Sequence, residues 1–292
     1  LSPNNGTSWT NAWTSFAAVV AAGTSGWRRG DTYYIASGTY NENVSISRAA
    51  SGTSRIIIKK ATETEHGSDS GWDGSYGTGQ AEIDGTLVIL NSYIDFDGVT
   101  GTDTSGYGIK IYYNKCDQLE SPTVTIVSLG VGTDSIHLRH LDIQGCGYAT
   151  YDRVGGFWHY GSNTQSDYNG TAPVNPSYDI EITDSWIHDV SVNGLTIGGH
   201  IGTSYDRGSL GFLLENSRIE RTGGTMYAYP DWHGQGLQIG YSATQDYLVF
   251  RNNKFIDMNG TGYIAVLGKS VNNHFRIYNN IFYSTDYNEF KA

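Results

Sequence analysis

The chain has 292 residues and a formal net charge of −11, with 38 glycines and 22 tyrosines but only 5 prolines and 16 % charged residues. This composition is typical of turn-rich β-structure. It excludes a nucleic-acid partner, because no segment supplies a cationic stripe for a phosphate backbone, and no apolar run approaches the ~20 residues of a membrane-spanning helix.

Residues 7–22 have the period of one amphipathic helix. Apolar side chains recur at Trp9, Ala12, Trp13, Phe16 and Val20, behind a Thr/Ser start. We expect this helix to cover the first strands, because an open end of stacked strands exposes unpaired backbone groups.

From residue 31 onward, short strands form an internal repeat. Each copy has an alternating strand, a polar turn residue, and then glycine leading into a second alternating strand. The central apolar positions of the first strands are Phe96, Leu138, Ile182, Leu214, Phe250 and Ile277. Their spacing varies from 27 to 44 residues, which fits the coils of a solenoid better than the blades of a propeller.

The predicted fold is therefore all-β, a single right-handed parallel β-helix of about seven coils that occupies residues 1–292. Residues 7–22 form its N-terminal cap and 31–292 its coils. The last coil, which ends at Ala292, is incomplete, so we expect a monomer or end-to-end self-association through this uncapped coil. Asn216, Asn252 and Asn279 recur at one turn and are expected to stack as an amide ladder.

Cys116 and Cys146 are too few for a disulfide scaffold and lack the spacing of a zinc site. Two buried thiols are favoured over a single disulfide. The chain begins at Leu1 without a leader and is interpreted as a processed product. Its polar, aromatic-rich β-surface suits a secreted protein that binds a polymer outside the cell or at its surface.

Two coils have long intervals between their first and second strands, which predicts two insertions flanking a groove. The interval is 13 residues from Phe96 to Ile109, from Ile182 to Leu195 and from Phe250 to Tyr263, but 19 from Leu138 to Phe157 and 23 from Leu214 to Leu237. The floor of the groove is the strand of residues 194–200. Leu195 and Ile197 are expected to point inward, and Thr196 outward with open space above it.

The insertions carry candidate catalytic groups. Asp152 and Asp231 lie on opposite insertions and suit the acid/base hydrolysis of a glycosidic bond if they face each other. A lyase needs a base and a cation beside a uronate carboxyl instead, for which the candidates are His159, His233, Arg153 and Lys110. No acidic run has the spacing of a dedicated calcium loop, so no cofactor is assigned, and Ca²⁺ stays an alternative for neutralising a carboxylate.

Aromatic side chains near the groove offer flat faces for stacking on sugar rings, and polar ones offer partners for hydroxyls. The substrate-binding candidates are Trp158, Tyr160, Tyr227, Tyr229, Trp232, Thr196, His200, Gln238 and Lys110.

The helix SWTNAWTSFAAVVAAG, the segment GDTYYIASGTYNENVSI and coils such as YLVFRNNKFIDMNGTGY resemble the pectin-lyase-like parallel β-helix superfamily, which includes polysaccharide lyases, polygalacturonase-like hydrolases and phage tailspikes. This resemblance implies a carbohydrate polymer as substrate. The stretch from His233 to Gly240 resembles the His-Gly strand of polygalacturonase-like hydrolases, whereas the Asn-Thr-Asp and Asp-Asp motifs of those enzymes are missing.

Two functions follow. The first is an extracellular polysaccharide lyase or glycoside hydrolase with a polysaccharide as its partner. The alternative is a non-catalytic β-helix, either a glycan-binding, adhesin or tailspike-like module or a structural subunit that stacks into a filament.

Overall fold

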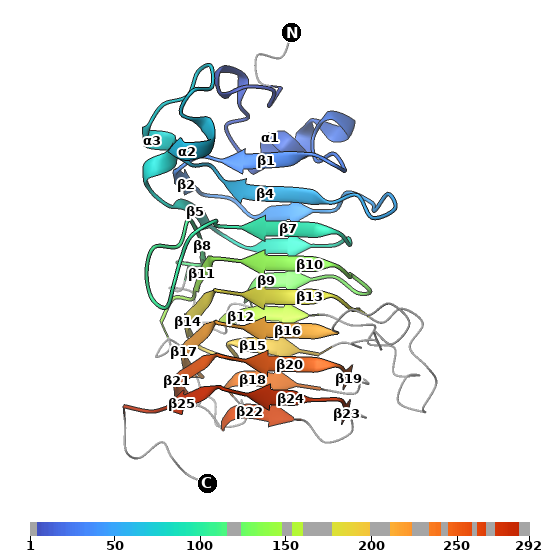
Figure 1. Cartoon of the computed structure of the whole chain (residues 1–292), viewed down its shortest axis with the longest axis vertical. Helices are drawn as coiled ribbons and strands as arrows, with labels where there is room; N and C mark the ends of the chain where they lie inside the picture. The colour runs from blue at the N-terminus through green and yellow to red at the C-terminus, as the bar shows by residue number, and fades with distance from the viewer. Residues whose placement is uncertain are drawn as a thin grey trace.

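The computed structural model describes residues 5–115, 124–147, 154–159, 177–198, 211–223, 234–240, 245–258, 262–266 and 272–285. Its strands lie in three long sheets, and the chain visits the sheets in turn before rising to the next level (Figure 1). Every strand pair within these sheets is parallel, and this arrangement is consistent with a parallel β-solenoid. In the described part of the chain, no helix is long and apolar enough to cross a membrane.

Sheets A and B have eight strands each. In stacking order, sheet A contains β1 (Thr32–Ile35), β4 (Ile56–Lys60), β7 (Ile94–Asp97), β10 (Ile136–Arg139), β13 (Ile180–Thr183), β16 (Phe212–Glu215), β20 (Leu248–Arg251) and β24 (Arg276–Tyr278). Sheet B contains β2 (Gly38–Tyr40), β5 (Ala81–Asp84), β8 (Ile109–Tyr112), β11 (Leu141–Gln144), β14 (Trp186–Val190), β17 (Arg218–Thr222), β21 (Lys254–Met258) and β25 (Ile281–Tyr283).

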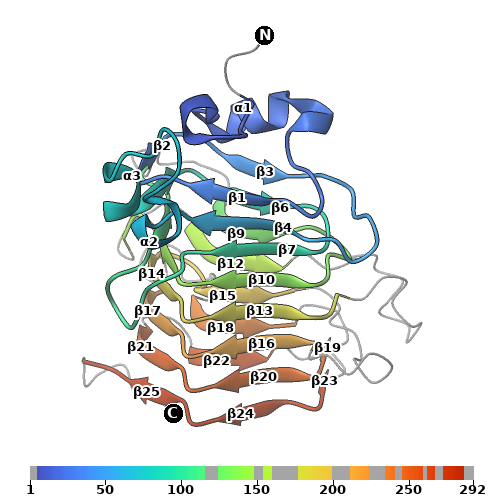
Figure 2. The ribbon, with the colours of Figure 1, turned by 45° about the horizontal axis from the view of Figure 1, so that its top comes forward.

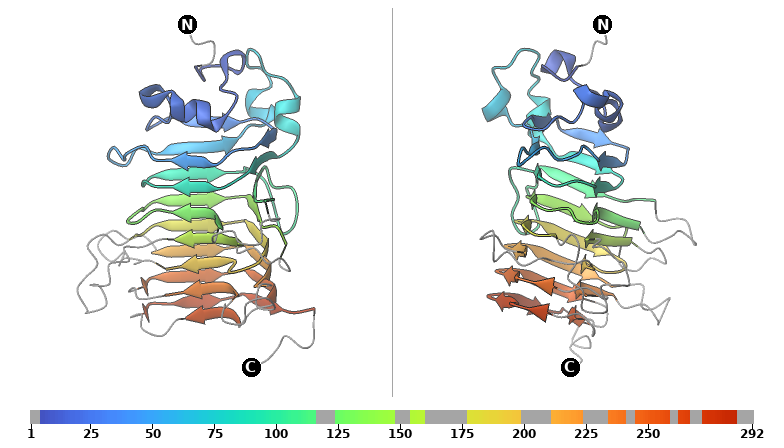
Figure 3. Two further views of the ribbon diagram at one scale, coloured as in Figure 1. Left: turned by 180° about the vertical axis from the view of Figure 1, so that it is seen from behind. Right: turned by 90° about the vertical axis from the view of Figure 1, so that its right-hand side faces the viewer.

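Sheet C has seven strands and completes the interior (Figure 3). It contains β3 (Val44–Ile46), β6 (Leu87–Ile89), β9 (Val124–Leu129), β12 (Val154–His159), β15 (Leu195–Ile197), β18 (Gln235–Ile239) and β22 (Gly262–Val266). A further parallel pair joins β19 (Gln245–Asp246) to β23 (Asn272–Asn273).

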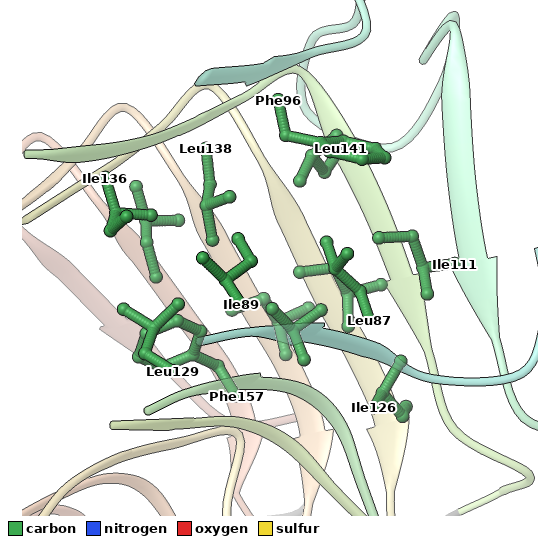
Figure 4. Close-up of a cluster of buried hydrophobic side chains, with 14 of the residues drawn as sticks. Leu87, Ile89, Phe96, Ile111, Ile126, Leu129, Ile136, Leu138, Leu141 and Phe157 are labelled. Carbon is green, nitrogen blue, oxygen red and sulfur yellow. The ribbon is translucent and has the colours of Figure 1, made fainter. Parts of the chain in front are cut away.

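The predicted register of the repeat is confirmed. Leu138 pairs with Phe96 on one side and Ile182 on the other, and the same row continues through Leu214, Phe250 and Ile277. All of these side chains are fully buried except Ile277 on the last strand of sheet A, which is 44 % exposed. Apolar side chains from the three sheets meet in the interior (Figure 4), and each buried Leu, Ile or Phe contributes about 1.5–3 kcal/mol to folding.

One residue with positive φ turns the chain from sheet A into sheet B. At His140, Asp184, Asn216, Asn252 and Asn279 this angle lies between 49° and 59°, in the left-handed region that Asn, Asp and His tolerate better than other side chains do. The strands that follow point along sheet B because of this turn.

The amide ladder was predicted one residue too early. Asn253 Nδ2 donates to Asn280 Oδ1 at 3.0 Å, and Asn253 Oδ1 accepts from the backbone N–H of Ser217 at 2.9 Å. Ser217 and Ser185 extend the same column through their hydroxyls. The asparagines at 216, 252 and 279 instead supply the left-handed turn, and the residue after each provides the side chain that stacks.

The helix predicted over residues 7–22 is shorter than expected. Residues Trp9–Asn11 form the 3-10 turn η1, Phe16–Ala21 form α1, and Gly23–Ser25 form the 3-10 turn η2. Ser15 caps α1 by accepting from Ala18 N–H at 3.0 Å. The inner face of α1 consists of Phe16 and Val19, whereas Val20 is 48 % exposed. The helix lies beyond the first strands at the N-terminal end (Figure 2), and α2 (Glu63–His66) and α3 (Ser75–Thr78) follow β4.

The preference for two free thiols is wrong. Cys146, just after β11, is in a disulfide. The only other cysteine of the chain is Cys116, which follows β8 in the sequence and lies outside the described residues.

Candidate functional site

The second strands of the repeat divide between two sheets, which corrects the predicted intervals. Ile109 belongs to sheet B, whereas Phe157, Leu195 and Leu237 lie in register in sheet C. The partner of Leu237 on the next strand is Ile264 rather than Tyr263. The sequence pattern treated the strands of sheets B and C as one element.

The length variation lies in the corner between sheets B and C. Counted from the central residue of sheet B to that of sheet C, the interval is 16 residues from Ile111 to Val127, 14 from Ile143 to Phe157, 8 from Ile187 to Leu195 and 18 from Ile219 to Leu237. The short corner after Ile187 lies between two longer ones, as predicted, but the coil of Ile109, which was predicted to be short, has a long corner as well.

Most of the predicted site residues lie outside the described residues and stay predictions. They are Asp152, Arg153, Tyr160, His200, Tyr227, Tyr229, Asp231, Trp232 and His233. Arg153 directly precedes β12, and His233 stands two residues before β18. In the sequence, the candidates of the two insertions therefore lead into β12 and β18, which both pair with β15 in sheet C.

Three of the predicted binding residues form one outward row of sheet C. Trp158 pairs with Thr196, and Thr196 pairs with Gln238. We call this row, together with Asn193, the sheet C floor. Thr196 and Gln238 are only 2 % and 3 % exposed, so the open space expected above Thr196 is not there.

Hydrogen bonds tie the sheet C floor together. Asn193 Nδ2 donates to Thr196 Oγ1 at 3.0 Å and to Gln238 Oε1 at 2.6 Å, while Asn193 Oδ1 accepts from the N–H of Gln235 at 2.9 Å. Gln238 Nε2 is buried and has no partner among the described residues. A buried donor without an acceptor costs about 1–3 kcal/mol.

The two remaining predicted residues lie apart from the floor. His159 is fully buried on the inward row between Leu129 and Ile197, and its Nε2 lies 2.8 Å from Ser177 Oγ. Lys110 lies on the outer face of sheet B between Glu82 and Asp142, with its Nζ 5.4 Å from the centroid of the Tyr112 ring. Neither side chain reaches the row of Trp158.

A second polar surface, on the outer face of sheet A, was not among the predicted sites. It is a hollow of about 300 Å³ over β1, β4, β7 and β10. We call this cavity the sheet A hollow. It is lined by Thr32, Tyr34, Ile57, Lys59, Asp95, Asp97, His137 and Arg139. The charged residues that alternate with apolar ones along the strand copies were the available sequence signal for this surface.

His137 is held between two carboxylates beside this hollow. Its Nδ1 lies 3.0 Å from Asp95 Oδ1 and its Nε2 3.5 Å from Asp179 Oδ1. Burial lowers the pKa of His137, but hydrogen bonds to Asp179 and Asp95 outweigh that effect and raise this pKa to about 8. The imidazole is therefore mostly protonated at neutral pH, with a carboxylate facing each of its nitrogens.

The same cluster does not fit a bound metal ion. Ligand atoms of His137, Asp179 and Glu181 lie within 4.8 Å of one another. However, Arg139 binds Glu181 at 2.9 Å and Arg55 lies 3.7 Å from Asp179. A protonated imidazole and two guanidinium groups already neutralise these carboxylates, whereas Ca²⁺ needs six to eight oxygen ligands.

Sheet B has a buried ion network of its own. His188 Nε2 lies 2.8 Å from Asp142 Oδ1, and its Nδ1 lies 2.6 Å from Asp189 Oδ2. Trp186 stacks on the imidazole at 3.6 Å between ring centroids. Burial raises the pKa of Asp189, but Arg221 and His188 outweigh it and lower this pKa well below its usual range. The partners satisfy one another, so this network joins β11, β14 and β17 rather than offering a site.

Comparison with protein-family models, curated proteins and solved structures finds no match to this chain.

Proposed function

We propose that the protein is a right-handed parallel β-helix of the pectin-lyase-like superfamily, and that it is a secreted carbohydrate-active protein. The all-parallel sheets support this fold, because crossovers between parallel strands are right-handed in ~98 % of cases. The disulfide at Cys146 supports an oxidising location outside the cytosol.

The glycan chain binds along the sheet C floor. The observation that carries this proposal is the half-buried indole of Trp158, which lies in one row with Thr196 and Gln238 and offers a face for a sugar ring. Gln238 Nε2, two strands away, is a donor that lacks an acceptor among the described residues.

The chemistry belongs to the corners beside the floor. Asp152 and Asp231 act as general acid and base in a hydrolase. In a lyase, His233 removes the proton α to the uronate carboxyl while Arg153 neutralises that carboxyl. Both schemes use the segments that lead directly into β12 and β18.

A non-catalytic glycan-binding module is the alternative. One observation favours it, because Trp158, Thr196, Gln238 and Asn193, the described residues of the floor, are all uncharged. Such a surface binds hydroxyl groups without moving protons.

A panel of neutral and uronic-acid polysaccharides tests the proposal. Absorbance of unsaturated products identifies a lyase, new reducing ends alone identify a hydrolase, and binding without products identifies the alternative. Asp231→Asn and His233→Ala should abolish turnover in a folded protein, and full activity in both would refute the catalytic scheme.

The floor itself is tested by Gln238→Ala. We expect about tenfold weaker polysaccharide binding, the effect of one lost hydrogen bond of about 1–1.5 kcal/mol. Gln144→Ala, on the outer face of sheet B, is the matched control and should bind like the wild type. Unchanged affinity in Gln238→Ala would contradict the placement of the glycan.

A further inference from the structure

We propose that the sheet A hollow is a second binding site, for an uncharged sugar residue, separate from the sheet C floor. It lies on the outer face of β1, β4, β7 and β10, near the N-terminal end of the column (Figure 1). Its volume of about 300 Å³ is at the lower end of small-molecule sites, the size expected for one or two sugar rings. The binding of a sugar here does not depend on the function proposed for sheet C, whereas the role of the hollow as a second attachment point rests on that function.

Each basic group of the hollow already has a carboxylate partner, which selects against charged ligands. Lys59, His137 and Arg139 are interleaved with Asp95 and Asp97 on neighbouring strands, and Arg55 binds Asp95 at 2.6 Å from the side. The two aspartates repel an anion, and the basic groups repel a cation. A hydroxyl group can donate a hydrogen bond to the aspartates and accept one from the basic groups.

Several polar atoms of the hollow keep capacity for a ligand. Asp95 receives Arg55 and His137 through Oδ1, and Asp97 receives Val99 N–H and His140 through Oδ1. Each Oδ2 is left without a partner among the described residues.

The basic groups have capacity as well. Arg139 Nη2 binds Glu181 and lies 3.2 Å from His137 Nδ1, whereas its Nη1 and Nε have no partner among the described residues. Lys59 Nζ has three donors, and within the described part of the chain it is paired with Glu65. Because neighbouring strands lie ~4.8 Å apart, adjacent hydroxyls of one sugar ring meet a carboxylate and a cation in succession.

Tyr34 supplies an aromatic surface at the end of the hollow. Its side chain is 39 % exposed. The ring is held edge-on against His66, with 4.1 Å between centroids, and Asp69 in turn bonds His66 Nδ1 at 2.9 Å. A ring fixed in this way stacks on a sugar with little loss of side-chain entropy.

A site on this sheet gives the protein a second point of attachment to a carbohydrate. Two attachment points on one polymer raise the effective concentration of chain at each of them. The sheet A hollow then holds polymer near the solenoid while the other site releases it.

Saturation-transfer NMR with glucose, galactose, mannose and N-acetylglucosamine, together with galacturonic acid, tests the site on the full chain. We expect at least one neutral sugar to bind with a Kd of about 1 mM and galacturonic acid to bind more weakly. Arg139→Gln and Lys59→Gln should each weaken the neutral sugar about tenfold. A sugar that is lost in Gln238→Ala but kept in both of these variants would lie on the sheet C floor instead, and this result would overturn the proposal.

Arg251→Gln is the matched control. Arg251 lies in the same row of sheet A and pairs with Glu215 as Arg139 pairs with Glu181, but it lies outside the hollow. It should bind like the wild type. The proposal is overturned if no neutral sugar binds, if galacturonic acid binds best, or if both hollow variants keep wild-type affinity while their melting temperatures show that they are folded.

Discussion

The outer faces of sheets A and C differ in charge although both are built from the same coils. Sheet A presents Asp95, His137, Glu181, Lys59 and Arg139 on adjacent strands. The equivalent row of sheet C reads Ser45, Val88, Ser128, Trp158, Thr196, Gln238 and Ala265, without an ionisable group.

Exposure explains this difference. The side chain of Arg139 is 37 % exposed, whereas the residue Thr196 is 2 % exposed. Water and neighbouring counter-charges stabilise ions on the open face. On the covered face a charge would lose its hydration without gaining a partner, so hydroxyls and amides that bond one another take its place. The two faces are therefore suited to different ligands.

The largest expected effect comes from introducing a charge into each face and comparing the loss of stability. Thr196→Asp buries a carboxylate on the sheet C floor and should destabilise the protein by about 4 kcal/mol or more. Thr32→Asp, on the sheet A face, should cost less than about 1 kcal/mol. Urea unfolding of both variants measures the contrast, and similar midpoints would show that the covered face tolerates charge.

A glycine column found in sheet C predicts the next largest effect. Gly156, Gly194 and Gly236 directly precede Phe157, Leu195 and Leu237, which lie in register, and a Cβ on Gly194 would come within 2.6 Å of Ile219 Cγ2 and 2.8 Å of the Gly236 carbonyl oxygen. Gly194→Ala should therefore lower the free energy of unfolding by about 1–3 kcal/mol. Gly106→Ala is a poor control because its φ is +78°, whereas Gly262, with open space around its Cβ position, provides a suitable one.

A smaller effect, confined to the open face, is pH dependence from His137. Its pKa in the folded protein is about 8, above the ordinary value of 6.5. Its stabilising contribution is thus complete below pH 6.5 and lost as the pH rises through 8. The loss for a shift of this size is about 2 kcal/mol. His137→Gln should flatten the fall in melting temperature between pH 6 and pH 9.

Arg251→Gln serves as the control for this pH series and should keep the wild-type slope. Some slope will persist in His137→Gln, because the carboxylate of Asp97 raises the pKa of His140 in the same direction. An equal slope in the wild type and His137→Gln would exclude His137 as its source.

The sequence predicted the register of sheet A but not the separate strands of sheet B. Around His140 the alternation shifts by one residue, since Leu138, Leu141 and Ile143 point inward on either side of it. A single left-handed residue turns the chain there without a glycine or proline to mark it. The recurrence of His, Asp and Asn at this position was the available signal.

The candidate sites stay predictions, and their surroundings could not be read from the sequence for a similar reason. Alternation fixed the outward direction of Thr196, but not its burial, which depends on residues distant in sequence. The sheet A hollow arises only when Lys59, Asp97 and Arg139, each about 40 residues apart, meet on neighbouring strands. No local motif encodes such a meeting.

The constant pairing of Phe157, Leu195 and Leu237 across corners of unequal length has an evolutionary consequence. Small insertions and deletions at these corners remodel the flanks of one face and leave the axial rise of the column unchanged. Lengthening the column requires duplication of an entire coil. Changes in ligand specificity and changes in the length of the column thus arise from different kinds of mutation.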